Sequence, residues 1–207
     1  MAAKSTLTNM VLCLTLVCLF CAAVLGGVYV LTYEPIKKAN ENILKASIGQ
    51  VLPEGVEISD VMSVEVAGTT YEYYEASADG HNAAYAVKST VVGFGGPLSL
   101  MVGVLPDGTV FNTSVLACNE TPGLGAKCQE ETSHFRTQFR GFTPDKTLKV
   151  KKDGGDVDAI TASTITSRAY TLAVSNAVAV VKTILGGACQ TEAASGASVP
   201  TEKKVEE

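Results

Sequence analysis

The chain contains no tryptophan, only two histidines and few charged residues for its length. Lysine and arginine together number 16 against 21 aspartate and glutamate residues, which gives a formal net charge of −5. A protein that binds nucleic acid needs a surplus of cations to neutralise the backbone phosphates. The sequence has no such surplus, so we exclude a nucleic-acid partner.

The sequence also lacks the patterns that bind metals and those that perform acid–base catalysis. Of its six cysteines, Cys13, Cys18 and Cys21 lie in a long apolar segment, where we interpret them as small apolar residues of a helix. The other three, Cys118, Cys128 and Cys189, form no Cys-x-x-Cys pair, and no histidine stands at metal-ligand spacing from them, so we predict no metal site. His81 and His134 occur singly in polar surroundings, and we assign no catalytic residue. A disulfide between Cys118 and Cys128 requires an oxidising compartment, and the sequence leaves that question open.

A long uncharged segment is the most prominent feature that is present. No charged residue occurs in Ser5–Tyr33, and its centre, Met10–Leu31, is almost entirely apolar. A helix needs about 20 apolar residues to cross a bilayer, whereas the apolar part of a secretory signal is shorter and precedes a small-residue cleavage site. We therefore predict a retained transmembrane anchor rather than a cleaved signal. Lys4 before the span and Lys37 and Lys38 after it give no clear orientation by the positive-inside rule.

The rest of the chain predicts one α+β domain built on an antiparallel sheet. Runs rich in β-branched and aromatic residues predict strands at 61–66, 69–75, 84–92, 98–105 and 109–116, and a last short strand at 148–150. Pro106-Asp107-Gly108 predicts a tight hairpin turn, because proline presets φ and glycine accepts a positive φ. Apolar residues at helical spacing predict a short helix from Pro35 to about Gly49 and a long one over 163–185, which Gly186-Gly187 would end.

Hydroxyls and small side chains are concentrated at the start of that long helix. Thr161-Ala162-Ser163-Thr164-Ile165-Thr166 follows shortly after Asp158. Unpaired backbone N–H groups and the positive end of the helix dipole favour an anion at a helix N-terminus, and serine or threonine oxygens can bond phosphate oxygens. The segment therefore predicts a phosphate cradle, although by itself it also fits an ordinary hydroxyl-rich helix cap.

The same segment resembles the flavinylation motif Ser/Thr-Gly-Ala-Thr-x-Thr, preceded by an aspartate, of the G subunit of Rnf complexes and the C subunit of sodium-pumping NADH:quinone reductases. In that family a dedicated transferase uses FAD to join FMN to the oxygen of the last threonine. The resemblance thus implies one covalent FMN on Thr166, with Thr161, Ala162, Ser163 and Thr164 around it. Two positions depart from the family pattern, because Ala162 replaces glycine and Ser163 replaces alanine.

Two further segments extend the resemblance. Glu120-Thr121-Pro122-Gly123-Leu124-Gly125 resembles the family's Glu-Thr-Pro-Gly-Leu-Gly loop, thought to lie against the flavin, which implies cofactor contacts for Glu120, Thr121 and Leu124. Gly93-Phe94-Gly95-Gly96-Pro97 resembles the Gly-Tyr-Gly-Gly-Pro element of the Rnf branch. The quinone-reductase branch usually has leucine and tryptophan after the second glycine, and this chain has no tryptophan, so we favour the Rnf G subunit.

The resemblance implies an electron-transfer subunit of a membrane complex that couples electron flow between ferredoxin and NAD to ion translocation. Such a chain is part of a translocase and is not catalytic on its own. The expected organisation is a short cytoplasmic N-terminus (1–9), a transmembrane helix (10–32), a helical linker (33–55), an FMN-binding domain with an antiparallel sheet and flanking helices (56–188) and a flexible tail (189–207).

The expected location is the bacterial inner membrane, with a single pass and the domain on the periplasmic or extracellular side. Expected partners are the other subunits of an Rnf-type complex, the flavin transferase and membrane lipid. The sequence leaves two alternatives open: the C subunit of a sodium-translocating NADH:quinone reductase, and a non-redox membrane-tethered binding protein. It does not distinguish sodium from protons as the transported ion.

Overall fold

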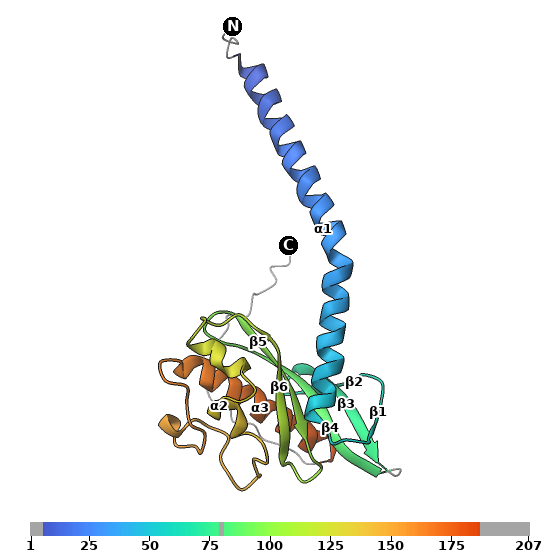
Figure 1. Ribbon diagram of the computed structural model, residues 1–207, viewed down its shortest axis with the longest axis vertical. Helices are drawn as coiled ribbons and strands as arrows, with labels where there is room; N and C mark the ends of the chain where they lie inside the picture. Colours follow the sequence, from blue (N-terminus) through green and yellow to red (C-terminus); the bar gives the residue numbers. More distant parts are fainter. Residues whose placement is uncertain (1–5, 79–80, 187–207) are drawn as a thin grey trace. The chain divides into compact units, whose positions relative to one another are not determined.

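A computed structural model describes residues 6–78 and 81–186 and divides the chain into two units, with the boundary between Leu44 and Lys45 (Figure 1). The first unit contains most of α1, a helix that runs from Leu7 to Val51 through Pro35. An 18-residue window of α1 has a mean hydropathy of 2.7 and is not buried, so this helix is long and apolar enough to cross a membrane. The predicted span and the predicted helix that follows it therefore form one continuous helix.

The second unit is built on a six-stranded sheet in which every neighbouring pair of strands is antiparallel. The strands lie in the order β1-β3-β4-β5-β6, and β2 also pairs with β3. They are β1 (Glu57–Ile58), β2 (Met62–Val66), β3 (Thr69–Ala78), β4 (His81–Val92), β5 (Pro97–Val104) and β6 (Val110–Cys118). The predicted α+β class with an antiparallel sheet is confirmed, and five of these strands lie where the sequence predicts them.

Two tight turns set the register of this sheet. Between β2 and β3, Ala67 and Gly68 have φ values of 51° and 78°, as a two-residue hairpin turn with the right twist requires. Between β5 and β6, the Leu105 N–H donates to the Thr109 carbonyl at 2.8 Å, and Gly108 has a φ of 87°. The second turn is the one that Pro106-Asp107-Gly108 predicts.

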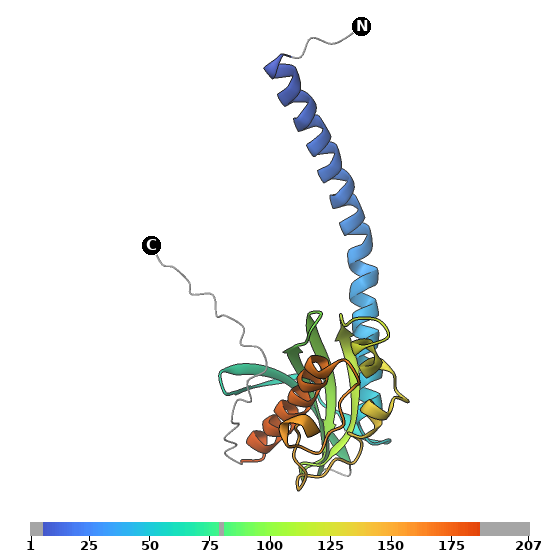
Figure 2. The same ribbon diagram turned by 90° about the vertical axis from the view of Figure 1, so that its left-hand side faces the viewer.

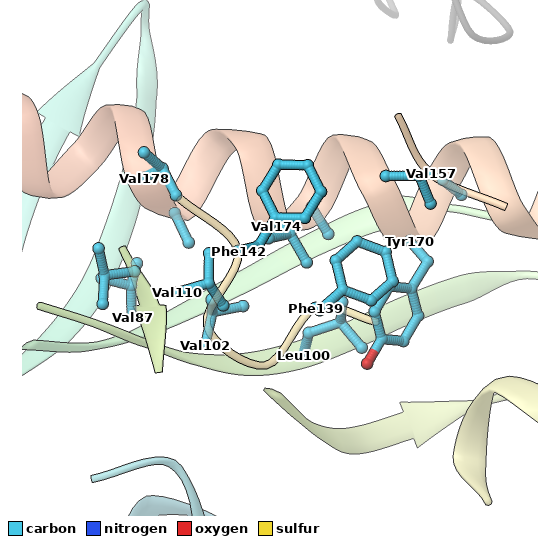
Figure 3. Close-up of a cluster of buried hydrophobic side chains, with 14 of the residues drawn as sticks. Val87, Leu100, Val102, Val110, Phe139, Phe142, Val157, Tyr170, Val174 and Val178 are labelled. Carbon is cyan, nitrogen blue, oxygen red and sulfur yellow. The ribbon is translucent and has the colours of Figure 1, made fainter. Parts of the chain in front are cut away.

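The main hydrophobic core lies between the sheet and α3 (Thr164–Ile184), which crosses one face of the sheet in both views (Figures 1 and 2). Alternate residues of β5 point to this face because side chains alternate along a strand. Figure 3 shows Leu100 and Val102 from that strand beside Val174 and Val178 of α3. The core continues into a group of aromatic rings, Phe135, Phe139, Phe142 and Tyr170, whose neighbouring centroids lie 5.0 to 6.4 Å apart.

The opposite face of the sheet is covered by the last turns of α1, which belong to the second unit. Ser114 Oγ of β6 donates to Ser47 Oγ at 3.1 Å, and the side-chain amide of Asn112 donates to the Gln50 carbonyl at 2.8 Å. The approach is so close that a Cβ on Gly103 would overlap the carbonyl oxygen of Val51. The domain fold therefore includes residues of α1 from Lys45 onward.

The segment between the sheet and α3 is mostly irregular. It contains η1 (Gly125–Gln129), the one-turn α2 (His134–Thr137) and η2 (Lys151–Asp153). The prediction of a strand at 148–150 is wrong, because only Val150 makes an isolated bridge, to Val157. The chain turns back at Gly154, whose φ is 80°, before a strand can extend.

Candidate functional site

Three separate segments meet at one end of the domain. The loop 93–96 follows β4, and the loop 119–124 follows β6. These loops share an edge because β5 begins beside the end of β4, at Val92 and Pro97, and its second residue pairs with Cys118 at the end of β6. The third segment is the start of α3, which reaches the same place through a close approach between Gly125 and Thr166.

The carboxylate of Glu120 joins the two loops. Its Oε1 accepts a hydrogen bond from the Phe94 N–H at 2.8 Å, and its Oε2 accepts one from the Gly95 N–H at 3.3 Å. The side chain is only 7% exposed. A Cβ on Gly93 would overlap Glu120 Oε1, and a Cβ on Gly95 would overlap the backbone oxygen of the residue before Glu120, so the glycines allow this approach. In this structure both carboxylate oxygens bond to backbone, and the predicted contact of Glu120 with a flavin remains a prediction.

Thr166 lies under the second loop. It is 2% exposed, and a Cβ on Gly125 would stand 2.8 Å from Thr166 Oγ1 and 2.9 Å from Glu120 Oε2. Within residues 6–78 and 81–186, no group makes a hydrogen bond with Thr166 Oγ1. Thr164 differs in both respects, because it is half-buried and its Oγ1 accepts a hydrogen bond from Lys152 Nζ at 3.5 Å. Of the two, Thr166 is the buried threonine and the one whose hydroxyl has no hydrogen-bond partner among the described residues.

The start of α3 leaves backbone donors available to an anion. Ser163 is the N-cap residue, but its side chain makes no capping hydrogen bond. Ser167 Oγ instead accepts from the Ile160 N–H at 2.9 Å and donates to the Ser163 carbonyl at 2.8 Å, which ties the entering loop to the helix. The N–H groups of residues 164–166 come too early in the helix to find a carbonyl four residues back. Together with the helix dipole they favour a bound phosphate.

Thr161 and Ala162 are exposed just before the helix. Ala162 has a φ of 63°, in the left-handed region that residues with a Cβ occupy at a cost. The motif that this segment resembles has glycine at the same position. The conformation gives that glycine a physical reason and shows that the alanine still permits the turn.

Ion pairs hold the loop that precedes the motif. Arg168 donates to both carboxylate oxygens of Asp153 at 2.6 and 2.7 Å, and this hydrogen bonding holds the pKa of Asp153 below its usual range. Lys151 bonds to Asp158, the aspartate before the motif, at 2.8 Å. This fixed loop presents Lys152 to Thr164, so a positive charge stands beside the hydroxyl segment.

Each of the three segments also exposes one large apolar side chain. These are Phe94, which is 69% exposed, Leu124 and Ile165. Thr121 is exposed on the same loop as Leu124. Of these, sequence reasoning did not single out Phe94 or Ile165 as site residues, nor Lys152 near the motif. The available signal for the first two was an apolar residue inside an otherwise polar or glycine-rich segment, a pattern that marks binding surfaces.

A buried threonine with an unpartnered hydroxyl in the first turn of a helix, beside the glycine-containing loop that follows β6, suits a protein that holds a phosphorylated cofactor. Residues 93–179, which contain all three segments, match the FMN-binding domain family. The crystal structure of the C subunit of the Na⁺-translocating NADH-quinone reductase from Parabacteroides distasonis has the same fold, with a TM-score of 0.52 at 22% sequence identity over 72% of this chain and 94% of that one.

Curated relatives show which group of proteins with an FMN-binding domain this chain resembles. The G subunit of the ion-translocating oxidoreductase complex of Shewanella piezotolerans is 34% identical over 185 residues, which cover 83% of this chain and 87% of that protein. The G subunit of the proton-translocating ferredoxin:NAD(+) oxidoreductase complex of Clostridium ljungdahlii is 32% identical over 176 residues, 84% of this chain and 91% of that protein. The chain therefore belongs to the family of G subunits of ion-translocating oxidoreductase complexes, which confirms the resemblance. With α1, this membership makes it a membrane-anchored protein.

Proposed function

We propose that this chain is the electron-transfer subunit of a membrane complex that couples electron flow between ferredoxin and NAD to ion translocation, and that it carries FMN covalently on Thr166. The observation that carries the attachment is the free hydroxyl of Thr166, set among backbone donors at the start of α3. Bound flavin supplies a group that takes up and releases electrons one at a time. The chain is thus part of a translocase and performs no catalysis alone.

The residues present fit a phosphoester on Thr166. The amide groups of residues 164–166 would bond the phosphate oxygens, and Lys152 would offset their negative charge. Thr161, Ala162 and Ser163 form the turn that opens the helix toward this anion. A capping hydrogen bond from the Ser163 hydroxyl oxygen would occupy one of these backbone donors. The Ser163 side chain makes no such bond, so the donors stay available to a phosphate.

The apolar side chains around the site suit the flavin ring. Phe94, Leu124 and Ile165 offer apolar surface from three separate segments of the chain, while Thr121 offers a hydroxyl. Burying such surface against an aromatic ring is favourable by about 25 cal/mol per Å². Glu120 sets the spacing between the loops that carry Phe94 and Leu124. Its proposed role toward the flavin is therefore to position these loops and to contact the ring through its remaining lone pairs.

The position of the domain relative to the membrane gives a reason for covalent attachment of the flavin. α1 would cross the bacterial inner membrane once, in contact with lipid, and place the domain on the periplasmic or extracellular side. No pool of flavin refills a site in that compartment, so a covalent bond would keep it filled. The proposed partners are the other subunits of the complex and a flavin transferase that uses FAD.

Paired substitutions at the two rival threonines test the attachment. Thr166→Val keeps the size of the buried side chain and removes its hydroxyl, whereas Thr166→Ser keeps the hydroxyl. After co-expression with an active flavin transferase, Thr166→Val should lose both the flavin fluorescence that survives denaturing electrophoresis and the mass increment of FMN minus water. Thr166→Ser and the matched control Thr164→Val should keep at least part of each. Loss in Thr164→Val with retention in Thr166→Val would move the bond to Thr164.

A further inference from the structure

Two cysteines lie in contact beside the proposed flavin site. Cys118 is the last residue of β6 and Cys128 lies in η1, and their Sγ atoms are 3.7 Å apart as free thiols. Cys128 is fully buried, whereas Cys118 is half-buried. A disulfide needs an S–S distance of about 2.05 Å, so the sulfurs would have to approach by less than about 2 Å.

This pair encloses the loop that covers Thr166. The chain between the two cysteines contains the whole Glu120–Gly125 segment. One end of that segment is fixed by the sheet, because Cys118 pairs with Leu98 of β5. The other end leads through η1 to Cys128 in the main core. A bond between the sulfurs would therefore fasten both ends of the loop.

The loop has to move for any group to reach Thr166. The side chain is 2% exposed, and Gly125 lies against its hydroxyl oxygen. Attachment therefore requires Gly125 and its neighbours to move away, whereas retention of the flavin is favoured when they return.

We propose that Cys118 and Cys128 form a disulfide that fastens the Glu120–Gly125 loop over Thr166, so that the loop opens for flavin attachment only while both cysteines are thiols. The opening part of this inference rests on the proposed attachment to Thr166. The disulfide itself does not, because it follows from the contact of the two sulfurs. Flavin attachment then precedes oxidation.

The oxidant is an external disulfide, and the exchange is balanced. The Cys118 thiolate attacks one sulfur of the external disulfide and releases the other as a thiolate. The Cys128 thiolate then attacks Cys118 in the mixed disulfide and releases the second sulfur. Two electrons pass from the cysteines to the external disulfide, and the two protons end on its thiols. Cys118 reacts first because it is the more exposed, whereas burial raises the pKa of the Cys128 thiol.

Peptide mapping tests the disulfide without reference to flavin. Full-length protein is isolated from membranes without reductant, its free thiols are blocked with N-ethylmaleimide under denaturing conditions, and it is digested with trypsin. Lys127 lies between the cysteines, so cleavage there places them in different peptides. We expect these peptides to be linked, and in a Cys118→Ser control we expect Cys128 to carry the maleimide. Maleimide on both cysteines of the unmutated protein would overturn the proposal.

The rate of attachment tests the opening of the loop. Flavin-free full-length protein, oxidised or reduced, is incubated with flavin transferase and FAD, and covalent fluorescence is followed with time. The reduced form should load at least about tenfold faster, because the crosslink restricts the open loop. Cys118→Ser should load at the faster rate in both conditions. Equal rates for the two forms of the unmutated protein would refute the opening of the loop as the controlled step. If the peptides are linked but neither the oxidised nor the reduced protein takes up covalent flavin, the proposed attachment and its regulation by the disulfide are both refuted. The disulfide itself would still be supported.

Discussion

Replacing Glu120 should separate a role in positioning the loops from a role in binding flavin. The bond from the Phe94 N–H, at 2.8 Å, is a hydrogen bond to a charged acceptor, for which about 1.5–3 kcal/mol is typical. The bond from the Gly95 N–H, at 3.3 Å, is longer than the usual range and adds little. Glu120→Ala leaves the Phe94 N–H without a partner and leaves a cavity where a side chain that is only 7% exposed had been. We therefore expect the free energy of unfolding to fall by about 3 kcal/mol.

Glu120→Gln is the matched control, because its amide oxygen can still accept from Phe94 without the charge. We expect a loss of about 1 kcal/mol for this variant. At about 3 °C per kcal/mol the melting temperatures should fall by about 10 °C and 3 °C, followed by near-ultraviolet circular dichroism of the flavin-free full-length protein. Hydrogen exchange should show the loss at the Phe94 amide. Unchanged stability in both variants, combined with an altered flavin spectrum in the loaded protein, would refute the positioning role and leave direct flavin contact as the function of Glu120.

Two further predictions concern α3 and its entry turn. Ala162→Gly should raise the free energy of unfolding by about 0.5–1 kcal/mol in urea titrations, because glycine accepts the φ of 63° without strain; a decrease would show that this strain is not significant. Burial raises the pKa of Tyr170 to about 12. Its stabilising contribution is therefore complete below pH 10 and is lost as the pH rises from 10 to 12, because over that range the tyrosine ionises in the unfolded chain but stays neutral in the folded one. Tyr170→Phe should lose about 1 kcal/mol at pH 8 with its hydrogen bond to Thr113, and its stability should fall less steeply between pH 10 and 12; equal slopes for the two proteins would contradict the assignment.

Local chemistry explains why much of the fold could be predicted from the sequence. The Pro106-Asp107-Gly108 turn contains its own conformational preferences, and it lies between strands whose apolar residues alternate. Two elements show the limit of this reasoning. β1 has only two residues, and it exists because Glu57 and Ile58 pair with the distant β3. The apolar run at 148–150 looked like a strand, but no neighbouring strand is available to extend its single bridge.

The site shows the same division between local and distant information. The hydroxyl segment before α3 identified Thr166 as a candidate, because the motif is continuous in sequence. Its burial could not be predicted, since it depends on Gly125 from a loop far away in the chain. The bond between Glu120 and Phe94 likewise joins residues 26 positions apart, and nothing in either segment alone indicates it. The left-handed conformation of Ala162 is similarly a result of the entry turn rather than of alanine itself.

The last turns of α1 have a consequence for how such proteins can evolve. Ile48 and Val51 are buried, and Gly103 of β5 has no room for any side chain against the Val51 backbone. Exchange of the membrane segment between relatives can therefore leave the domain intact only if the junction falls before Lys45. A recombination point after Leu52 would instead place the end of another protein's helix against a sheet surface that is complementary to the end of α1 in this chain. The unit of inheritance thus extends beyond the cofactor-binding segment and includes the end of the anchor helix.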